Sequence, residues 1–175
     1  MTDYRQLPVD LPVPEDDGGA NHLPGSRLPE RLAGLGADLL VAYVYPRTGT
    51  PGEPSPVGWD DIPGARGCTP QSCAYRDALA EFEALGASVV GISAQSAAEQ
   101  AEFAAREHIP FPLLSDPELQ LADEMGLPTF EVEGMTLYKR LTFVAEASEI
   151  VRVFYPVFPP DRNAAEVLAW LRRNG

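Results

Sequence analysis

The chain has 175 residues, 45% of them hydrophobic, and carries a formal net charge of −13. Length and apolar content together predict a single globular domain, residues 1–175, with a sizeable core. The acidic balance and the lack of a basic stripe argue against a nucleic-acid partner, because nucleic-acid binding depends on contacts to phosphate. The sequence lacks an apolar run long enough to cross a bilayer, and its first six residues are polar, unlike a signal peptide. We therefore expect a cytoplasmic protein with no membrane partner.

Two cysteines and two histidines are scattered along the chain and make a poor zinc site, so we expect neither a metal nor a cofactor. A structural disulfide is disfavoured in a reducing cytosol, and the cysteines are better interpreted as a catalytic or redox pair. His22 lies in a loop-like context and is expected at the surface. His108 falls at the end of a predicted helix, where a capping role and a functional role are equally compatible with the sequence.

The N-terminal segment, residues 1–37, is rich in proline, glycine and aspartate. It predicts irregular structure with one short edge strand around Leu11 to Pro14. The continuous apolar run 38–45 predicts a strand at the centre of a sheet that is covered on both faces, and Pro46 ends it.

Residues 47–67 are interrupted by prolines and glycines and predict a long loop, and loops of this length are usually functional. Trp59 and Ile62 are expected to pack part of it against the body of the domain. A helical pattern follows over residues 69–85 and ends at Gly86, with an apolar face formed by Cys73, Leu79, Phe82 and Leu85.

The C-terminal half alternates strands with helices. Strands are predicted at 88–93 and 111–115, and Met135 to Val144 with Glu149 to Phe154 predict a hairpin that turns at 146–148. Ser96 and Glu99 form a capping box for a helix that reaches Glu107. Another helix is predicted to begin at Asp116, with Pro117 in its first position, and to end at Gly126. Asn163 and Glu166 are expected to cap a last helix, whose apolar stripe consists of Val167, Leu168, Trp170 and Leu171.

This alternation predicts an α/β fold with a central sheet and helices on both faces. In such folds the chemistry lies at the C-terminal ends of the parallel strands, where the sequence places the region from Tyr45 to Cys73.

Both cysteines lie where a strand and loop give way to a helix. A helix N-terminus favours an anion, so Cys68 is biased toward the reactive thiolate. Residues five apart in a helix have Cα atoms roughly 8–9 Å apart, whereas disulfides rarely span more than about 7 Å. A Cys68–Cys73 bridge would therefore require the first turns of the helix to unwind, and Pro70 weakens the helix there. The residues thus indicate thiol redox chemistry at Cys68.

The stretch from Gly67 to Asp77, Gly-Cys-Thr-Pro-Gln-Ser-Cys-Ala-Tyr-Arg-Asp, resembles the two-cysteine signature of the peroxiredoxins of the PrxQ or bacterioferritin-comigratory-protein class. Residues 111–116, Arg140 with Thr142-Phe143, and Tyr45-Pro46 are also similar to that class. The resemblance, which runs from about residue 38 to the C-terminus, implies a thioredoxin-like three-layer α/β/α sandwich with a central mixed sheet.

The resemblance further implies a thiol peroxidase that reduces hydrogen peroxide or organic hydroperoxides. Cys68 would be the peroxidatic cysteine and Cys73 the resolving one, joined in an intramolecular disulfide that a thioredoxin-like dithiol reduces. Arg140 would place a positive charge beside the thiolate, Pro46 would support the active site, and a monomer is the class's common state.

The sequence departs from the class before Cys68. The pattern Pro-x-x-x-Thr-x-x-Cys places its proline seven positions before the cysteine, whereas Pro46 lies 22 positions before Cys68, an insertion of 15 residues. The position three before the cysteine is Ala65, so an active-site hydroxyl would have to come from Thr48 or Thr50. We favour Thr48, because Thr50 precedes a proline and is biased to an extended backbone.

The roles of the insertion and of Arg66 stay open. The inserted loop either restricts substrate size, shapes the surface for a reductase, or is a packed loop without function, and Arg66 either shares the electrostatic role or faces solvent. Two alternatives to a peroxidase also remain. A thioredoxin-type disulfide oxidoreductase would need two residues between its cysteines, where this chain has four. The other is an inactive binding or stress protein on a redox fold.

Overall fold

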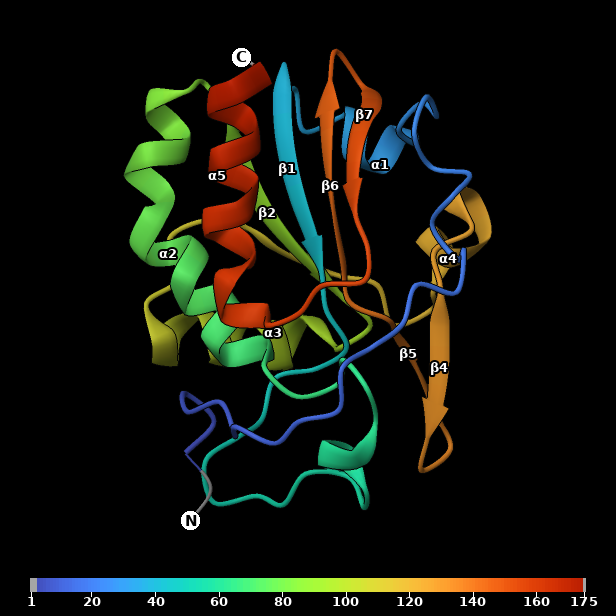
Figure 1. Ribbon diagram of the computed structural model, residues 1–175, viewed down its shortest axis with the longest axis vertical. Helices are drawn as coiled ribbons and strands as arrows, with labels where there is room; N and C mark the ends of the chain where they lie inside the picture. The colour runs from blue at the N-terminus through green and yellow to red at the C-terminus, as the bar shows by residue number, and fades with distance from the viewer. Residues whose placement is uncertain (1–2, 175) are drawn as a thin grey trace.

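The computed structural model describes residues 3–174 and contains a five-stranded mixed sheet in the order β3-β2-β1-β6-β7 (Figure 1). The strands are β1 (Leu39–Val44), β2 (Ser88–Ser93), β3 (Leu113–Ser115), β6 (Leu141–Glu146) and β7 (Glu149–Phe154). β1 pairs in parallel with β2, and β2 with β3, whereas β6 is antiparallel to both β1 and β7. The mixed sheet is the one predicted.

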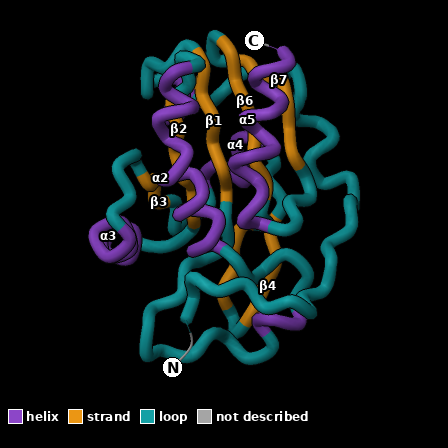
Figure 2. The backbone as a smooth tube through the Cα atoms, turned by 60° about the vertical axis from the view of Figure 1, so that its left-hand side comes forward, coloured by secondary structure: helices purple, strands orange, loops and turns teal. Residues whose placement is uncertain are grey.

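Helices cover both faces of this sheet (Figures 1 and 2). The helices are α1 (Glu30–Ala33), α2 (Cys68–Ala84), α3 (Ala97–Glu107), α4 (Gln120–Met125) and α5 (Asn163–Asn174). α2 and α5 pack together on one face, α1 and α4 cover the other, and α3 contacts edge strand β3. This layering confirms the predicted α/β/α sandwich. No helix within residues 3–174 has both the length and the apolar character needed to cross a membrane.

The continuous apolar run at 38–45 forms the middle strand, as predicted. Alternate side chains of β1 enter two different cores: Val41 and Tyr43 pack on the α2–α5 side, whereas Leu40 and Ala42 pack on the side of α4. All four side chains are buried, which explains why the run shows no alternation of polar and apolar residues.

The N-terminal segment is irregular as expected, but it forms no strand at Leu11 to Pro14, so that prediction is wrong. Prolines cannot donate to a strand ladder, and the alternation of proline there leaves too few N–H groups. The isolated bridge of this segment instead joins Arg27 to Glu149 in β7. The segment begins beside the inserted loop and runs along the molecule to α1 and the start of β1 (Figure 1).

Two helix predictions need correction. Leu85, expected on the buried face of α2, is 38% exposed and follows the end of the helix. α4 begins at Gln120 rather than beside Pro117, because Leu119 takes a left-handed conformation with φ of 55°. The Asp116 carboxylate still acts as a cap, since it accepts the backbone N–H groups of Gln120 and Leu121 at 3.0 and 2.9 Å. The Ser96–Glu99 capping box of α3 is confirmed.

The predicted strand 135–144 is in fact two strands. β5 (Met135–Tyr138) pairs with β4 (Thr129–Val132), which the sequence did not predict, and β6 pairs with β7. The predicted turn at 146–148 is confirmed, because Ala147 and Ser148 both have positive φ, as a tight hairpin turn requires. The break between β5 and β6 falls at Lys139 and Arg140, so Arg140 can leave the sheet and face α2.

The inserted loop is held against the body, as predicted. It contains one short 3₁₀ turn, Trp59–Asp61, and the Trp59 side chain is only 5% exposed. Trp59 packs with Ala65 and with side chains of the β4–β5 hairpin, and Ile62 lies against the same cluster.

Candidate active site

Cys68 is the first residue of α2 and is only 3% exposed. Gly67 precedes it with φ of 117°, a conformation that glycine adopts readily and other residues rarely do. A Cβ at Gly67 would also lie 2.7 Å from Pro160, so glycine is required here on two grounds. The turn directs the thiol to the N-terminus of the helix, where unpaired N–H groups and the helix dipole stabilise an anion.

Arg140 lies directly beside this sulfur, with its Nη2 3.2 Å from Cys68 Sγ. The same nitrogen donates to the Ala65 carbonyl at 2.9 Å, while Nε of the buried guanidinium donates to the Gly64 carbonyl at 3.2 Å and Nη1 donates to the side-chain oxygen of Gln71. Among residues 3–174, no carboxylate forms an ion pair with Arg140. A buried charge without a carboxylate partner is costly, and the Cys68 sulfur is one of the groups that the guanidinium contacts directly.

The Asn163 side chain accepts hydrogen bonds from the residues that support Arg140. The prediction that Asn163 caps the last helix is therefore wrong. A 3₁₀ turn, Pro160–Arg162, runs directly into α5, so Asn163 is already in a helical conformation and its side chain points inward. Its Oδ1 accepts hydrogen bonds from Gln71 Nε2 (3.1 Å), Tyr75 OH (2.6 Å) and Thr142 Oγ1 (2.7 Å). Gln71 therefore connects Asn163 to Arg140. A local capping pattern gave no indication of this inward role.

A small pocket opens at Cys68, and all three threonines of the region line it: Thr48, Thr50 and Thr69. The Thr48 hydroxyl lies 3.3 Å from the side-chain oxygen of Gln95, and its backbone N–H donates to the same oxygen at 3.0 Å. Thr69 is buried and its Oγ1 has no hydrogen-bond partner within the described chain. Thr69 was not considered from the sequence, although its position next to Cys68 was a signal.

Pro46 and Arg66 border the same region. Pro46 is buried at the end of β1, and its carbonyl accepts a hydrogen bond from Ser93 at 3.2 Å, which fixes the start of the inserted loop. Arg66 lines the pocket, and its guanidinium pairs with Asp60 at 3.0 Å. The structure thus brings the predicted Cys68, Arg140, Thr48 and Pro46 together at one end of the sheet.

Cys73 lies one and a half turns along α2 and is partly exposed. Burial raises the pKa of its thiol, and the neighbouring Glu107 and Asp77 carboxylates act in the same direction, whereas Arg76 and Arg5 oppose them. Both cysteines are free, and the intact helix between them keeps the sulfurs from bonding.

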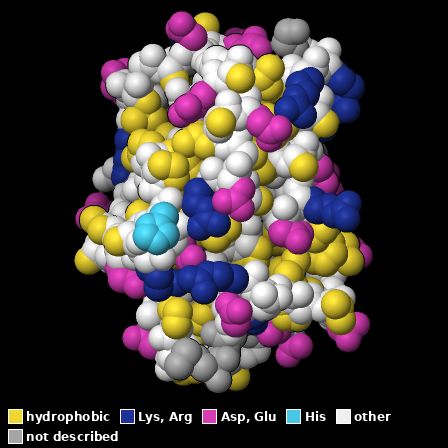
Figure 3. Space-filling view, turned by 90° about the vertical axis from the view of Figure 1, so that its left-hand side faces the viewer, with side chains coloured by type: hydrophobic (Ala, Val, Ile, Leu, Met, Phe, Trp, Pro, Cys, Tyr) yellow, Lys and Arg dark blue, Asp and Glu magenta, His cyan; other side chains and the backbone are white. Residues whose placement is uncertain are grey.

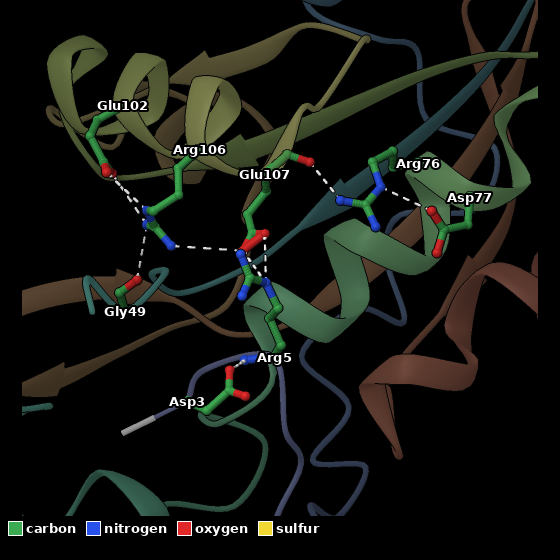
Figure 4. A network of polar contacts seen from close by, with 8 residues as sticks. All are labelled: Asp3, Arg5, Gly49, Arg76, Asp77, Glu102, Arg106 and Glu107. Carbon is green, nitrogen blue, oxygen red and sulfur yellow. Dashed lines mark hydrogen bonds and ion pairs between the residues drawn. The ribbon is translucent and has the colours of Figure 1, made fainter. Parts of the chain in front are cut away.

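A network of charges joins the N-terminal segment, α2 and α3 (Figure 4), and Arg5, Arg76, Asp77 and Glu107 of this network act on the Cys73 thiol. Arg5 of the N-terminal segment donates to both oxygens of the buried Glu107 carboxylate at 2.8 and 3.0 Å. Arg76 of α2 donates to the Glu107 backbone carbonyl at 2.6 Å and pairs with Asp77 at 2.9 Å. On the face where this network lies, basic and acidic side chains are interspersed (Figure 3). Within residues 3–174, no cluster of His, Cys, Asp and Glu could hold a metal ion.

Sequence comparison places these residues in a known family. Residues 62–154, just over half of the chain, match the AhpC/TSA family. A chloroplastic peroxiredoxin Q of Sedum lineare is 34% identical over 145 residues, which cover 82% of this chain and 69% of that protein. The chloroplastic peroxiredoxin Q of Oryza sativa subsp. japonica is 35% identical over 134 residues, 76% of this chain and 54% of the relative. The chain thus spans about half the length of the rice protein.

Structural comparison agrees. The crystal structure of peroxidoxin BcpB from Mycobacterium tuberculosis has a TM-score of 0.68 and 29% identity, and covers 87% of this chain and 98% of its own. PrxQ from Xylella fastidiosa has the same TM-score and coverage at 24% identity, which shows a shared fold. The chain belongs to the AhpC/TSA family and, within it, to the peroxiredoxins of the peroxiredoxin Q class. The predicted thioredoxin-like fold is confirmed.

Proposed function

We propose that the protein is a thiol peroxidase in which Cys68 is the peroxidatic cysteine. The Cys68 thiolate attacks one oxygen of a hydroperoxide, so that an S–O bond forms while the O–O bond breaks. The departing hydroxide or alkoxide takes up one proton, equivalent to the one that the thiol lost on ionising, and leaves as water or an alcohol, while the sulfur, oxidised by two electrons, becomes a sulfenic acid. Arg140 acts as a catalytic residue that stabilises the thiolate and the charge on the departing oxygen.

The observation that carries this proposal is the 3.2 Å contact between Arg140 Nη2 and Cys68 Sγ, a sulfur whose residue lines a small pocket. The guanidinium is held on its other sides by two carbonyls and an amide, so it needs no rearrangement as charge develops. Thr48 is proposed to supply a hydroxyl to the peroxide, and Pro46 to support the turn that carries it.

The second step joins the cysteines. The Cys73 thiol condenses with the Cys68 sulfenic acid, which forms an S–S bond and releases water. The helical spacing requires the beginning of α2 to unwind first. Unwinding breaks the hydrogen bonds that Gln71 makes to Arg140 and Asn163, and the bond that Tyr43 donates to Ser72 at 3.0 Å. An external dithiol, proposed to be thioredoxin-like, then reduces the disulfide by exchange.

The test is mass spectrometry of the reduced protein after one equivalent of hydrogen peroxide. The wild type should lose two hydrogens, whereas Cys73→Ser should gain one oxygen, in a form that dimedone traps. Cys68→Ser should show neither change at the same peroxide concentration. Full peroxidase activity in Cys68→Ser would refute the assignment.

We further propose a monomer that acts in the cytoplasm, where a reducing environment keeps both thiols available. Sedimentation of the reduced and oxidised protein tests the monomer, and fractionation of native cells tests the compartment. A stable dimer in both redox states, or a protein recovered outside the cytoplasm, would contradict the respective proposal.

A further inference from the structure

Tyr4 of the N-terminal segment lines the same pocket as Cys68 and is itself only 6% exposed. Its hydroxyl donates to the Glu53 carbonyl at 2.6 Å and accepts a hydrogen bond from Ser55 at 3.2 Å. The Arg66 guanidinium lies over its ring, 5.5 Å from the ring centroid. These contacts tie the N-terminal segment to the inserted loop at the wall of the pocket.

The Tyr4 ring also rests directly on the pocket wall at Gly49. A Cβ at position 49 would lie 2.3 Å from the ring carbons, a distance at which the ring would have to move. Glycine at this position therefore allows the ring to reach its place. Tyr4 is thus fixed by its hydroxyl at one end and by close packing of its ring at the other.

The pocket that Tyr4 and Cys68 line has a small volume. The cavity volume is about 20 Å³, and a single buried water needs on the order of 10–15 Å³. The remaining walls include the side chains of Thr48, Thr69 and Trp59. We propose that Tyr4 is a specificity-determining residue that restricts the peroxidase to small hydroperoxides, with hydrogen peroxide the substrate that fits. This inference rests on the function proposed above.

A larger hollow nearby offers no alternative route to the sulfur. It has a volume of about 440 Å³ and is lined by Phe130, Tyr155 and Arg140, but Cys68 is not among its lining residues. Of these two hollows, the one that Tyr4 lines is therefore the one that includes Cys68.

The wall of the pocket around Tyr4 comes from parts of the chain outside the family match. The AhpC/TSA match begins at residue 62, whereas Tyr4, Glu53 and Ser55 all precede it. The contacts that Tyr4 makes to Glu53 and Ser55 therefore lie outside the region that matches the family.

The test compares kcat/KM for hydrogen peroxide and for cumene hydroperoxide, with dithiothreitol as reductant so that no protein partner has to dock. Tyr4→Ala should raise the ratio of cumene hydroperoxide to hydrogen peroxide by at least about tenfold, the low end of the discrimination that a pocket achieves for one methylene. Tyr4→Phe keeps the ring and should leave the ratio near that of the wild type. Val9→Ala, at a side chain 95% exposed, controls for changes in this segment.

Gly49→Ala is an independent variant, because its methyl group should displace the ring and raise the ratio while Tyr4 is intact. If Tyr4→Ala fails to fold, Gly49→Ala still tests whether the Tyr4 ring restricts the size of the substrate. Equal kcat/KM for both peroxides in the wild type, or an unchanged ratio in Tyr4→Ala and Gly49→Ala, would overturn the size restriction and leave the peroxidase function standing. A wild type that consumes neither peroxide would instead overturn the peroxidase function itself.

Discussion

The side-chain amide of Gln71 donates a 3.1 Å hydrogen bond to Asn163, and its oxygen accepts from Arg140. Asn163→Ala would leave the buried donors of Gln71, Tyr75 and Thr142 without their acceptor, at a cost of about 1–3 kcal/mol for each unsatisfied group. We therefore expect a drop in the free energy of unfolding, measured with urea, and a slower reaction of Cys68 with peroxide.

The matched control for this variant is Asn174→Ala, an exposed asparagine whose amide bonds only the Trp170 carbonyl. It should leave both the unfolding midpoint and the peroxide reaction unchanged. If Asn163→Ala were as stable as Asn174→Ala, the anchoring role of the Asn163 oxygen would be wrong.

Arg140 should be needed for its shape as well as its charge. Arg140→Met removes a preorganised donor and should slow the oxidation of Cys68 on the order of 10²–10³-fold, as loss of an oxyanion donor does elsewhere. Arg140→Lys keeps the charge but cannot bind Gly64, Ala65, Gln71 and the sulfur together, so most of the loss should persist. Stopped-flow measurement of Cys68 oxidation provides the rates, and a lysine variant at wild-type speed would contradict this prediction.

The three threonines of the pocket can be separated by valine substitution, which keeps the shape and removes the hydroxyl. Thr48→Val should slow peroxide reduction if its hydroxyl binds the peroxide as proposed, with Thr50→Val as the adjacent control. Thr69→Val tests the hydroxyl for which residues 3–174 provide no hydrogen-bond partner. A loss confined to Thr69→Val would move the role from Thr48 to Thr69.

The contact between Arg5 and Glu107 should slow disulfide formation, because it holds the N-terminal segment and α3 around Cys73. Arg5→Ala should therefore speed the peroxide-independent second phase of oxidation, observed by rapid quenching and mass spectrometry. Arg172→Ala, which removes an exposed pair with Glu81 at 3.3 Å, is the control. An Arg5→Ala protein with an unchanged second phase would show that this contact does not limit the unwinding.

Cys73 should alkylate slowly near neutral pH in the folded, reduced protein. Burial raises the pKa of its thiol, so the reactive thiolate forms only at a higher pH than in an unfolded cysteine. In Cys68→Ser, the rate of reaction with iodoacetamide should rise at a higher pH than in the same protein unfolded in urea. Coincident profiles would contradict the burial of Cys73.

The sequence predicted what depends on local pattern. The apolar run of β1, the capping box at Ser96 and the two-cysteine stretch each carry their signal within a few residues, and the structure has them where expected. The break at Arg140 was missed because β5 and β6 read as one alternating strand. The partner of β5, the four-residue β4, was too short to show a period of its own.

Contacts between segments that are distant in the chain could not be predicted from one sequence. Asn163 satisfies a capping pattern locally, and only the positions of Gln71, Tyr75 and Thr142 reveal why its side chain points inward. Tyr4 likewise lies outside any helix or strand, and its place in the wall of the Cys68 pocket depends on a glycine 45 positions later in the chain.

The beginning and the middle of α2 are held in different ways. Tyr75 stacks on Tyr43 of the central strand with ring centroids 4.5 Å apart, and its hydroxyl bonds Asn163. Both cysteines precede this anchor, so the turns that must open for a disulfide end before it. In the proposed cycle, the part of α2 that would unwind for the disulfide therefore ends before Tyr75, and the rest of the helix would stay attached to the central strand.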